Sequence, residues 1–207
     1  MPKRPAKSSA AKAAPGAVGG AVRIIAGSWR GRSIAVLPGN AVRPTSDRVR
    51  EALFNRLAHA FGDIGFRLAG ARVLDVFAGT GALGLEALSR GAAHAVLLDR
   101  NPEAIDLIKR NVAKLGADDR ASIMNADGAH LPLAPGPCDL AFLDPPYGEG
   151  LVEPALQGLA KQGWLKPGAL VSIETDASDV APDAVSYKIL DRRAYGRVAI
   201  TFVQFIP

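Results

Sequence analysis

The stretch "VLDVFAGTGALGLEAL", residues 73–88, decides the fold. It begins as a short apolar strand, continues through Gly79, Gly81 and Gly84 in a G-x-G-x-x-G arrangement, and ends in a helical run. Glycine lets the backbone approach a ligand closely, and the N-terminus of a helix offers free N–H groups. The stretch therefore predicts a strand, a ligand-binding turn and a helix, a pattern that nucleotide-binding oxidoreductases also use.

Strand-length apolar runs alternate with helical runs on the carboxyl side of this stretch. We expect strands at 72–77, 94–99, 121–125, 139–144 and 169–175, and helices at 82–90, 102–115 and 151–162. Such alternation predicts an α/β fold with a parallel sheet covered on both faces. The last two runs, 185–193 and 196–205, are separated by a short turn, which predicts an antiparallel pair at one edge.

Three acids are expected at the same edge of that sheet. Asp75 lies inside the first strand beside the glycine turn, where a carboxylate would crowd a pyrophosphate but suits an ammonium group. Asp99, 20 residues after Gly79, suits a ribose, and Asp127 could accept a hydrogen bond from an adenine amino group. S-adenosylmethionine has those three parts. The alternative is that each acid ends a strand or caps a helix.

The fourth strand runs into "DLAFLDPPYGEGL", residues 139–151. Its two prolines fix the backbone and restrict the residue before them, so Asp144 is held stiffly. The Asp144 carboxylate and the Pro145 carbonyl could each accept one N–H of an exocyclic base amine, which turns its lone pair toward a methyl donor. Tyr147 would stack on the base, and no histidine base is required.

Basic charge is concentrated in the first quarter of the chain. Residues 1–20 hold four Lys or Arg and no acid, and residues 21–56 hold seven Arg against Asp47 and Glu51. The remaining residues, 57–207, carry a net charge of −4, although the whole chain carries +5. This distribution predicts an appendage that contacts phosphates on a near-neutral body, although solvated surface charge is the alternative.

The amino-terminal quarter predicts three segments. Residues 1–20 are rich in Ala, Lys, Pro and Gly and should form a disordered basic tail. Residues 21–44 should form a β-hairpin extension turning at 27–31, with Trp29 near its tip, and residues 45–207 the main domain. Thr45 or Ser46 could cap a helix with an apolar stripe. Arg48 and Arg50 would lie off this stripe, where each could pair with Glu51, cover the helix or bind phosphate.

Composition excludes several classes of protein. The chain has 207 residues, of which 48% are hydrophobic, and no apolar run approaches the roughly 20 residues of a membrane span. Cys138 is the single cysteine, so we expect a reducing compartment, the cytoplasm. His59, His94 and His130 lack neighbours at ligand spacing, so we expect no metal and read all three as ordinary fold residues.

From Val22 onward the chain resembles the bacterial RsmD family of 16S ribosomal RNA guanine-N2 methyltransferases. The resemblance is carried by the glycine-rich and DPPY stretches and by "RIIAGSWRGR" (23–32), "RPTSDRVREALFNRL" (43–57), "LDRNPEAI" (98–105) and "YGR" (195–197). It implies a Rossmann-like class I fold dependent on S-adenosylmethionine, with a mostly parallel seven-stranded sheet. The implied partner is 16S rRNA in the small ribosomal subunit or an assembly intermediate, bound by a monomer with no membrane contact.

The same resemblance assigns the site residues. Residues implied to bind the methyl donor are Asp75, Phe77, Gly79, Gly81, Asp99, Arg100, Asp127 and Gly128. Residues implied to hold the guanine amine during catalysis are Asp144, Pro145, Pro146 and Tyr147. Residues implied to meet RNA are Arg23, Arg30, Arg32 and Arg43.

Three rival functions remain at this point. A DNA adenine-N6 methyltransferase uses the same DPPY chemistry, but the chain has no room for a region that reads a DNA sequence. A nucleotide-binding oxidoreductase would explain the glycine turn and not the DPPY stretch. A non-catalytic RNA-binding module would tolerate the loss of Asp144.

Overall fold

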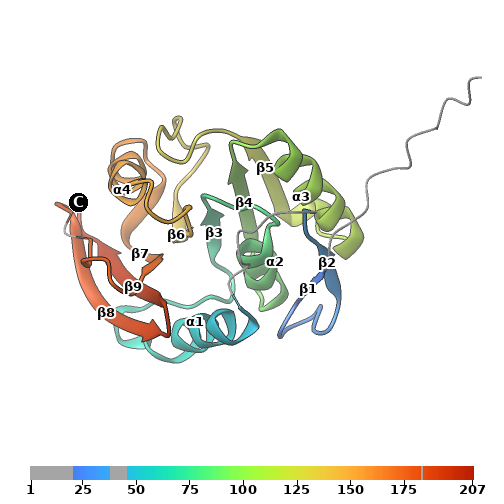
Figure 1. Cartoon of the computed structure of the whole chain (residues 1–207), viewed down its shortest axis with the longest axis horizontal. Coiled ribbons are helices and arrows are strands. Elements are labelled where there is room, and N and C mark those ends of the chain that lie inside the picture. The colour runs from blue at the N-terminus through green and yellow to red at the C-terminus, as the bar shows by residue number, and fades with distance from the viewer. Residues whose placement is uncertain (1–20, 38–45, 183) are drawn as a thin grey trace, which may run out of the picture.

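Residues 21–37, 46–182 and 184–207 are described by the computed structural model, in which a seven-stranded sheet has the order β5-β4-β3-β6-β7-β9-β8 (Figure 1). In chain order the strands are β3 Arg72–Asp75, β4 His94–Asp99, β5 Ala121–Asn125, β6 Cys138–Leu143, β7 Leu165–Asp176, β8 Tyr187–Tyr195 and β9 Val198–Phe205. Strands β3 to β7 run parallel, whereas β9 pairs antiparallel with β7 and β8. The predicted α/β fold with an antiparallel edge pair is confirmed.

Helices cover both faces of the sheet. They are α1 Asp47–His59, α2 Ala82–Ser89, α3 Pro102–Leu115 and α4 Val152–Lys161, with short 3-10 turns η1 Gly62–Ile64 and η2 Asp118–Arg120. Because consecutive strand residues point to opposite faces, Leu97 packs in one core with α1, α2 and α3, and Leu98 packs in the other with α4. Of the helices that the structure describes, none has the length and apolarity needed to cross a bilayer.

The amino-terminal hairpin, β1 Ala21–Arg23 and β2 Ser33–Ala35, lies against α2 and α3 (Figure 1). Its side chains of Val22, Ile24, Trp29 and Ile34 are buried in the same core as α1, α2 and α3. The hairpin therefore packs as part of the body. The predicted tail, 1–20, and the predicted boundary at 44–45 lie outside the described residues. The division of the chain into tail, extension and main domain therefore stays a prediction.

Buried polar side chains of the body hold the backbone of the hairpin loop. The Glu86 carboxylate accepts hydrogen bonds from the N–H groups of Ile25 (2.7 Å) and Ala26 (3.0 Å). Ser89 Oγ accepts from the Trp29 N–H at 3.0 Å. Glu86 is fully buried and also pairs with Arg90 Nε at 2.6 Å, so these bonds complete its set of partners and fix the loop to α2.

Helix α1 contains a buried arginine, Arg50, which the sequence analysis expected to lie off the apolar face of the helix. Ser46 caps the helix as expected, its Oγ accepting from the Val49 N–H. Arg50, however, is 1% exposed, and its Nη2 donates to the Arg23 carbonyl (2.6 Å) and to Asp47 Oδ1 (2.9 Å). The hairpin covers this side of α1, so Arg50 ties the two together instead of pairing with Glu51 or binding phosphate.

Candidate active site

The candidate site lies where the chain reverses its direction of winding through the sheet. From β3 the chain moves outward to β4 and β5 and then returns to place β6 on the other side of β3. Ligands of such sheets bind at the carboxyl ends of the strands flanking this point. From the roles that the sequence predicts for them, we call the part around residues 75–81, 99–101 and 126–130 the donor half, and the part formed by residues 144–153 and 174–182 the acceptor half.

The glycine turn of the donor half is closed by Asp99. Gly79 has φ +53° and Gly81, the N-cap of α2, has φ +78°, conformations that L side chains rarely adopt. Asp99 Oδ2 accepts from the Gly79 N–H at 2.8 Å, and its Oδ1 accepts from the Asn101 N–H at 2.8 Å. The turn is thus pre-formed by the acid that ends β4.

Asp75 lies beneath this turn and is 1% exposed. Its Oδ2 accepts from the Gly84 N–H at 3.0 Å, which connects the end of β3 to the first turn of α2. Burial raises the pKa of Asp75 to about 7, because the charged form loses its hydration, and the Gly84 bond offsets only part of this effect. The carboxyl is therefore poised to titrate near neutral pH.

Asp127 and Gly128 follow β5, the strand at the edge of the sheet beside β4. Asp127 accepts from the Ala129 N–H (3.0 Å) and lies 2.7 Å from His130 Nδ1; the His130 hydrogen bond is the main cause that lowers the pKa of Asp127. At Gly128 an added Cβ would lie 2.6 Å from the Phe77 ring, so these two residues are in tight contact. The sequence analysis expected His130 to be an ordinary fold residue and did not predict its hydrogen bond with Asp127.

Arg100 reaches from the donor half toward the acceptor half. Its Nη2 lies 3.5 Å from Glu149 Oε2, just after the DPPY turn. Both side chains are about half exposed, so solvent screens the pair and its contribution to stability is small. The contact joins the two halves of the site at Arg100 and Glu149.

The DPPY turn extends from the end of β6, a hydrogen-bonded neighbour of β3. Pro145 is buried, whereas Pro146 and Tyr147 are exposed at the surface of the turn. The Tyr147 hydroxyl donates to Glu174 Oε1 at 2.8 Å. Partial burial and, after it, this bond to Glu174 raise the pKa of Tyr147, so its hydroxyl stays protonated and acts as a donor.

A cavity of ≈ 330 Å³ opens between the DPPY turn and the end of β7. Its lining includes Pro145, Pro146, Tyr147, Leu151, Glu174 and Val180. Sequence analysis did not select Glu174, although an acid within the apolar run "ALVSIET" repeats the signal that marked Asp75. This acid joins three of the four predicted amine-holding residues, Pro145, Pro146 and Tyr147, at the cavity, whose lining does not include Asp144.

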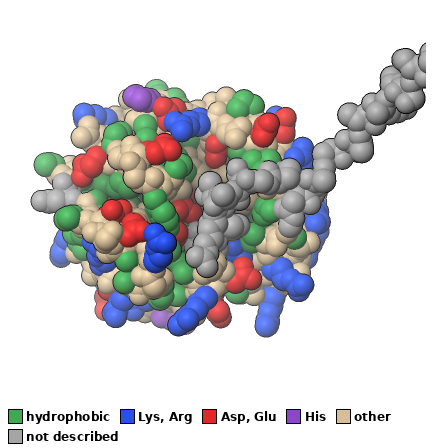
Figure 2. Space-filling view, viewed as in Figure 1, with side chains coloured by type: hydrophobic (Ala, Val, Ile, Leu, Met, Phe, Trp, Pro, Cys, Tyr) green, Lys and Arg blue, Asp and Glu red, His purple; other side chains and the backbone are tan. Residues whose placement is uncertain are grey.

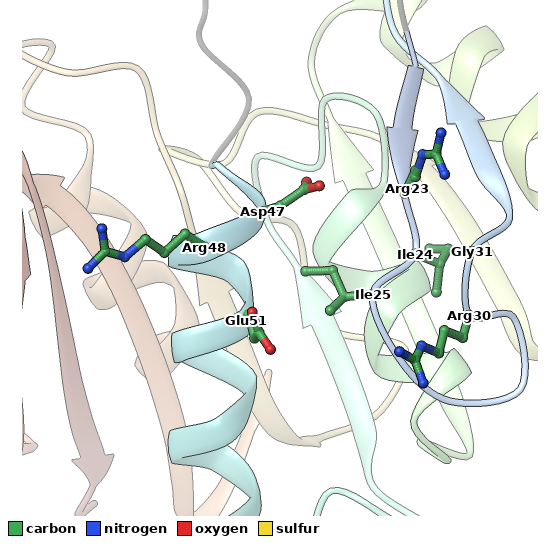
Figure 3. A pocket seen from close by; sticks show the side chains of 8 residues that line it. All are labelled: Arg23, Ile24, Ile25, Arg30, Gly31, Asp47, Arg48 and Glu51. Carbon is green, nitrogen blue, oxygen red and sulfur yellow. The ribbon is translucent and has the colours of Figure 1, made fainter.

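The arginines expected to meet RNA do not all lie together. Arg23 and Arg30 line a groove of ≈ 370 Å³ between the hairpin and α1, with Arg48 on its helix side, pointing away from the hairpin (Figure 3). Arg32 instead donates to the carbonyls of Lys114 and Leu115 at the end of α3. Arg43 lies outside the described residues.

The groove carries both signs of charge on an apolar floor. Asp47 and Glu51 line it from α1, and Ile24 and Ile25 line it from the hairpin (Figure 3). Figure 2 shows Lys and Arg side chains projecting from the lower margin of the face in view, where Figure 1 places α1 and the hairpin. The groove is therefore a candidate contact for a phosphate backbone, with acids that would limit how closely it approaches.

The sheet order, the glycine turn and the DPPY turn together define a methyltransferase of the α/β class. Residues 22–204 match the family described as "Conserved hypothetical protein 95". "Ribosomal RNA small subunit methyltransferase D" from Escherichia coli K12 is 39% identical over 187 residues, 89% of this chain and 90% of that protein. Its counterpart from Haemophilus influenzae is 36% identical over 189 residues, 89% of this chain and 94% of that protein.

A solved structure agrees with these sequence matches. The Escherichia coli protein yhhF, described as a methyltransferase, superposes with a TM-score of 0.76 at 38% identity, covering 90% of this chain and 99% of that one. The chain belongs to the RsmD family, as its motifs indicated. Its relatives are methyltransferases, which argues against an oxidoreductase and against a module without catalytic activity.

Proposed function

We propose that this protein is an rRNA methyltransferase that transfers the methyl group of S-adenosylmethionine to the exocyclic N2 amine of a guanine in 16S rRNA. The observation that carries the proposal is the pairing of β3 with β6, Asp75 opposite Phe142, which makes the glycine turn and the DPPY turn neighbours. A donor held at one would lie beside an amine held at the other. The names of the bacterial relatives supply the small-subunit rRNA.

The residues of the donor half fit S-adenosylmethionine. At Gly79 an added Cβ would meet only the Phe77 carbonyl, at 4.0 Å, so the backbone here is open to a ligand. Asp99 would accept a hydrogen bond from the ribose and Asp127 from the adenine, and Asp75, although 1% exposed here, would face the ammonium group. The other proposed donor-binding residues are Phe77, Gly81, Arg100 and Gly128. When bound, the donor supplies an electrophilic methyl carbon.

The acceptor half provides the groups that would direct the amine. Asp144 and the Pro145 carbonyl accept its two N–H groups, which concentrates the lone pair on the side facing the donor. The stiffness of two consecutive prolines keeps both acceptors in place, and Pro146 and Tyr147 border the cavity that would receive the base. The methylated nitrogen then loses its proton to solvent, so no buried base is needed.

Substrate binding would extend to the groove between the hairpin and α1. Arg23 and Arg30 are placed to contact phosphates, whereas Arg32 is placed to hold the end of α3. Arg43 keeps its proposed RNA role without structural support. Such a reaction belongs in the cytoplasm, where ribosomal subunits are assembled.

A transfer assay with tritiated S-adenosylmethionine tests this function. Small subunits from a strain lacking the gene should accept label in 16S rRNA, and mass mapping should place one methyl group on the N2 of a single guanine. Plasmid DNA should accept none. Label in adenine of DNA alone would replace the proposal by the DNA adenine-N6 alternative, and label in neither would refute methyl transfer to nucleic acid.

A further inference from the structure

Glu174 is a buried acid on the strand next to the one that carries the DPPY turn. It is 5% exposed, yet it lines the cavity of the acceptor half. Leu143 and Ile173 are paired across β6 and β7, so the next residues along are neighbours: Asp144 follows the last residue of β6, and Glu174 lies within β7, two residues before its end. Two acids thus lie near the carboxyl ends of neighbouring strands; Glu174 lines the cavity, and Asp144 directly precedes Pro145, which also lines it.

A hydrogen bond with the DPPY turn orients the second carboxylate. The Tyr147 hydroxyl donates to Glu174 Oε1 at 2.8 Å, while the tyrosine remains 49% exposed at the mouth of the cavity. Burying an acid is costly unless it is hydrogen-bonded, and an apolar residue would suit the interior of β7 equally well. A carboxylate oxygen has two lone pairs, so Oε1 can accept from Tyr147 and from a ligand together.

A guanine bound by its 2-amino group presents a second donor beside it, the N1–H. Adenine and cytosine carry an unprotonated ring nitrogen next to their exocyclic amine, which is an acceptor. A carboxylate accepts hydrogen bonds and donates none, so it favours guanine and repels the other two. Bases turned out of an RNA helix are read in this way, along the Watson–Crick edge.

We propose that Glu174 selects guanine by accepting its N1–H while Asp144 and the Pro145 carbonyl hold its 2-amino group. This inference rests on the proposed guanine-N2 activity. In this proposal Glu174 on β7 selects the base, and the DPPY turn aligns the 2-amino nitrogen of that base. Tyr147 then acts as a positioning residue for Glu174 in addition to bordering the base.

The test replaces the target guanosine by 2,6-diaminopurine riboside in 16S rRNA ligated from synthetic fragments and reconstituted into small subunits. This base keeps the 2-amino group but has an acceptor at N1. The wild-type protein should prefer guanine strongly, because a site that hydrogen-bonds one partner rejects an analogue lacking it. Glu174→Gln can donate from its amide, so the ratio of kcat/KM for guanine over diaminopurine should fall by about tenfold or more.

Matched variants separate base selection from other roles of the acid. Glu153→Gln removes an exposed acid lining the same cavity and should leave the ratio unchanged. Tyr147→Phe keeps the ring and removes only the bond that positions Glu174, so it should retain most of the preference for guanine, even if kcat falls. The affinity for S-adenosylhomocysteine, measured by calorimetry, should be equal in all variants. Equal affinity would show that the donor half is folded in each of them.

Three results would overturn the inference. One is an unchanged ratio in Glu174→Gln, and another is an equal loss of preference in Tyr147→Phe, which would assign selection to the hydroxyl. The third needs no variant: a wild-type protein that methylates diaminopurine as fast as guanine. If the wild type methylated neither base, the proposed function itself would fail, which distinguishes the two failures.

Discussion

The two halves of the site differ in where their polar groups find partners. In the donor half, Asp75, Asp99 and Asp127 all accept hydrogen bonds from backbone N–H groups of turns. In the acceptor half, the bond from Tyr147 to Glu174 joins two side chains from separate segments. The donor half is therefore organised by its own turns, whereas the acceptor half depends on the packing of β7 beside β6.

This difference predicts that the two halves can be damaged separately. Changes in the acceptor half should reduce methyl transfer and leave donor binding intact. Changes in the donor half should reduce donor binding and stability together, because its carboxylates also hold the turns.

The largest effect is expected for Asp144→Ala in the acceptor half. Removing the acceptor that fixes the amine should lower kcat by roughly 10²- to 10³-fold, the loss typical when one pre-organised polar group is removed from a reaction centre. Affinity for S-adenosylhomocysteine, measured by calorimetry, should not change. Asp119→Asn, which changes an exposed acid within η2, serves as the control with full activity. Loss of donor binding in Asp144→Ala would show that the halves are not independent.

Gly128→Ala should damage the donor half. The new Cβ would lie 2.6 Å from the Phe77 ring and 2.8 Å from Val76 Cγ1, and such overpacking typically costs about 1–3 kcal/mol. We expect a lower free energy of unfolding in urea and donor affinity reduced about tenfold or more, since Phe77 must move.

Gly136→Ala provides the matched control. An added Cβ at Gly136 meets nothing within 4 Å, and its φ is not in the left-handed region. Stability and donor affinity should both stay at the level of the wild type. Equal behaviour of the two variants would contradict the tight contact between Phe77 and Gly128.

The same difference explains how much the sequence could reveal. Gly79 and Gly81 lie close together along the chain, and the position of Asp99 follows from the geometry of neighbouring parallel strands. Motif spacing was therefore enough to predict the donor half and the α/β fold. Glu174 carries the same local signal as Asp75, an acid within an apolar strand, but its position beside Asp144 depends on the register of β7 against β6, which no local pattern encodes. Arg50 was misplaced because its burial results from the hairpin packing on α1, a contact between separate segments.

Asp75 makes the donor half sensitive to pH. Its pKa is raised to about 7 from an ordinary value of 3.8, mainly by burial, with Asp99 adding a smaller contribution of the same sign. Between about pH 4 and pH 7 the folded protein therefore binds more protons than the unfolded chain, and stability should fall as pH rises. Asp75→Asn should remove this slope, measured by urea unfolding across that range.

Donor binding should show the opposite trend, because an ammonium group pairs with the ionised carboxylate. If only that form binds well, the affinity for S-adenosylhomocysteine should increase about tenfold from pH 6 to pH 8. Methylthioadenosine lacks the ammonium group and should bind with little change. A flat profile for both ligands would remove Asp75 from the proposed contacts.

The smallest effect is expected at the groove between the hairpin and α1, where Arg30 and Arg32 make a matched pair. Arg30 lines the groove, whereas Arg32 donates to carbonyls at the end of α3. Arg30→Ala should raise the KM for subunits a few-fold and lower the salt dependence of RNA binding by about one ion, because one phosphate contact is lost. Arg32→Ala should keep the salt dependence and lose a little stability through the uncapped end of α3. Equal salt slopes for Arg30→Ala and the wild type would place RNA elsewhere on the protein.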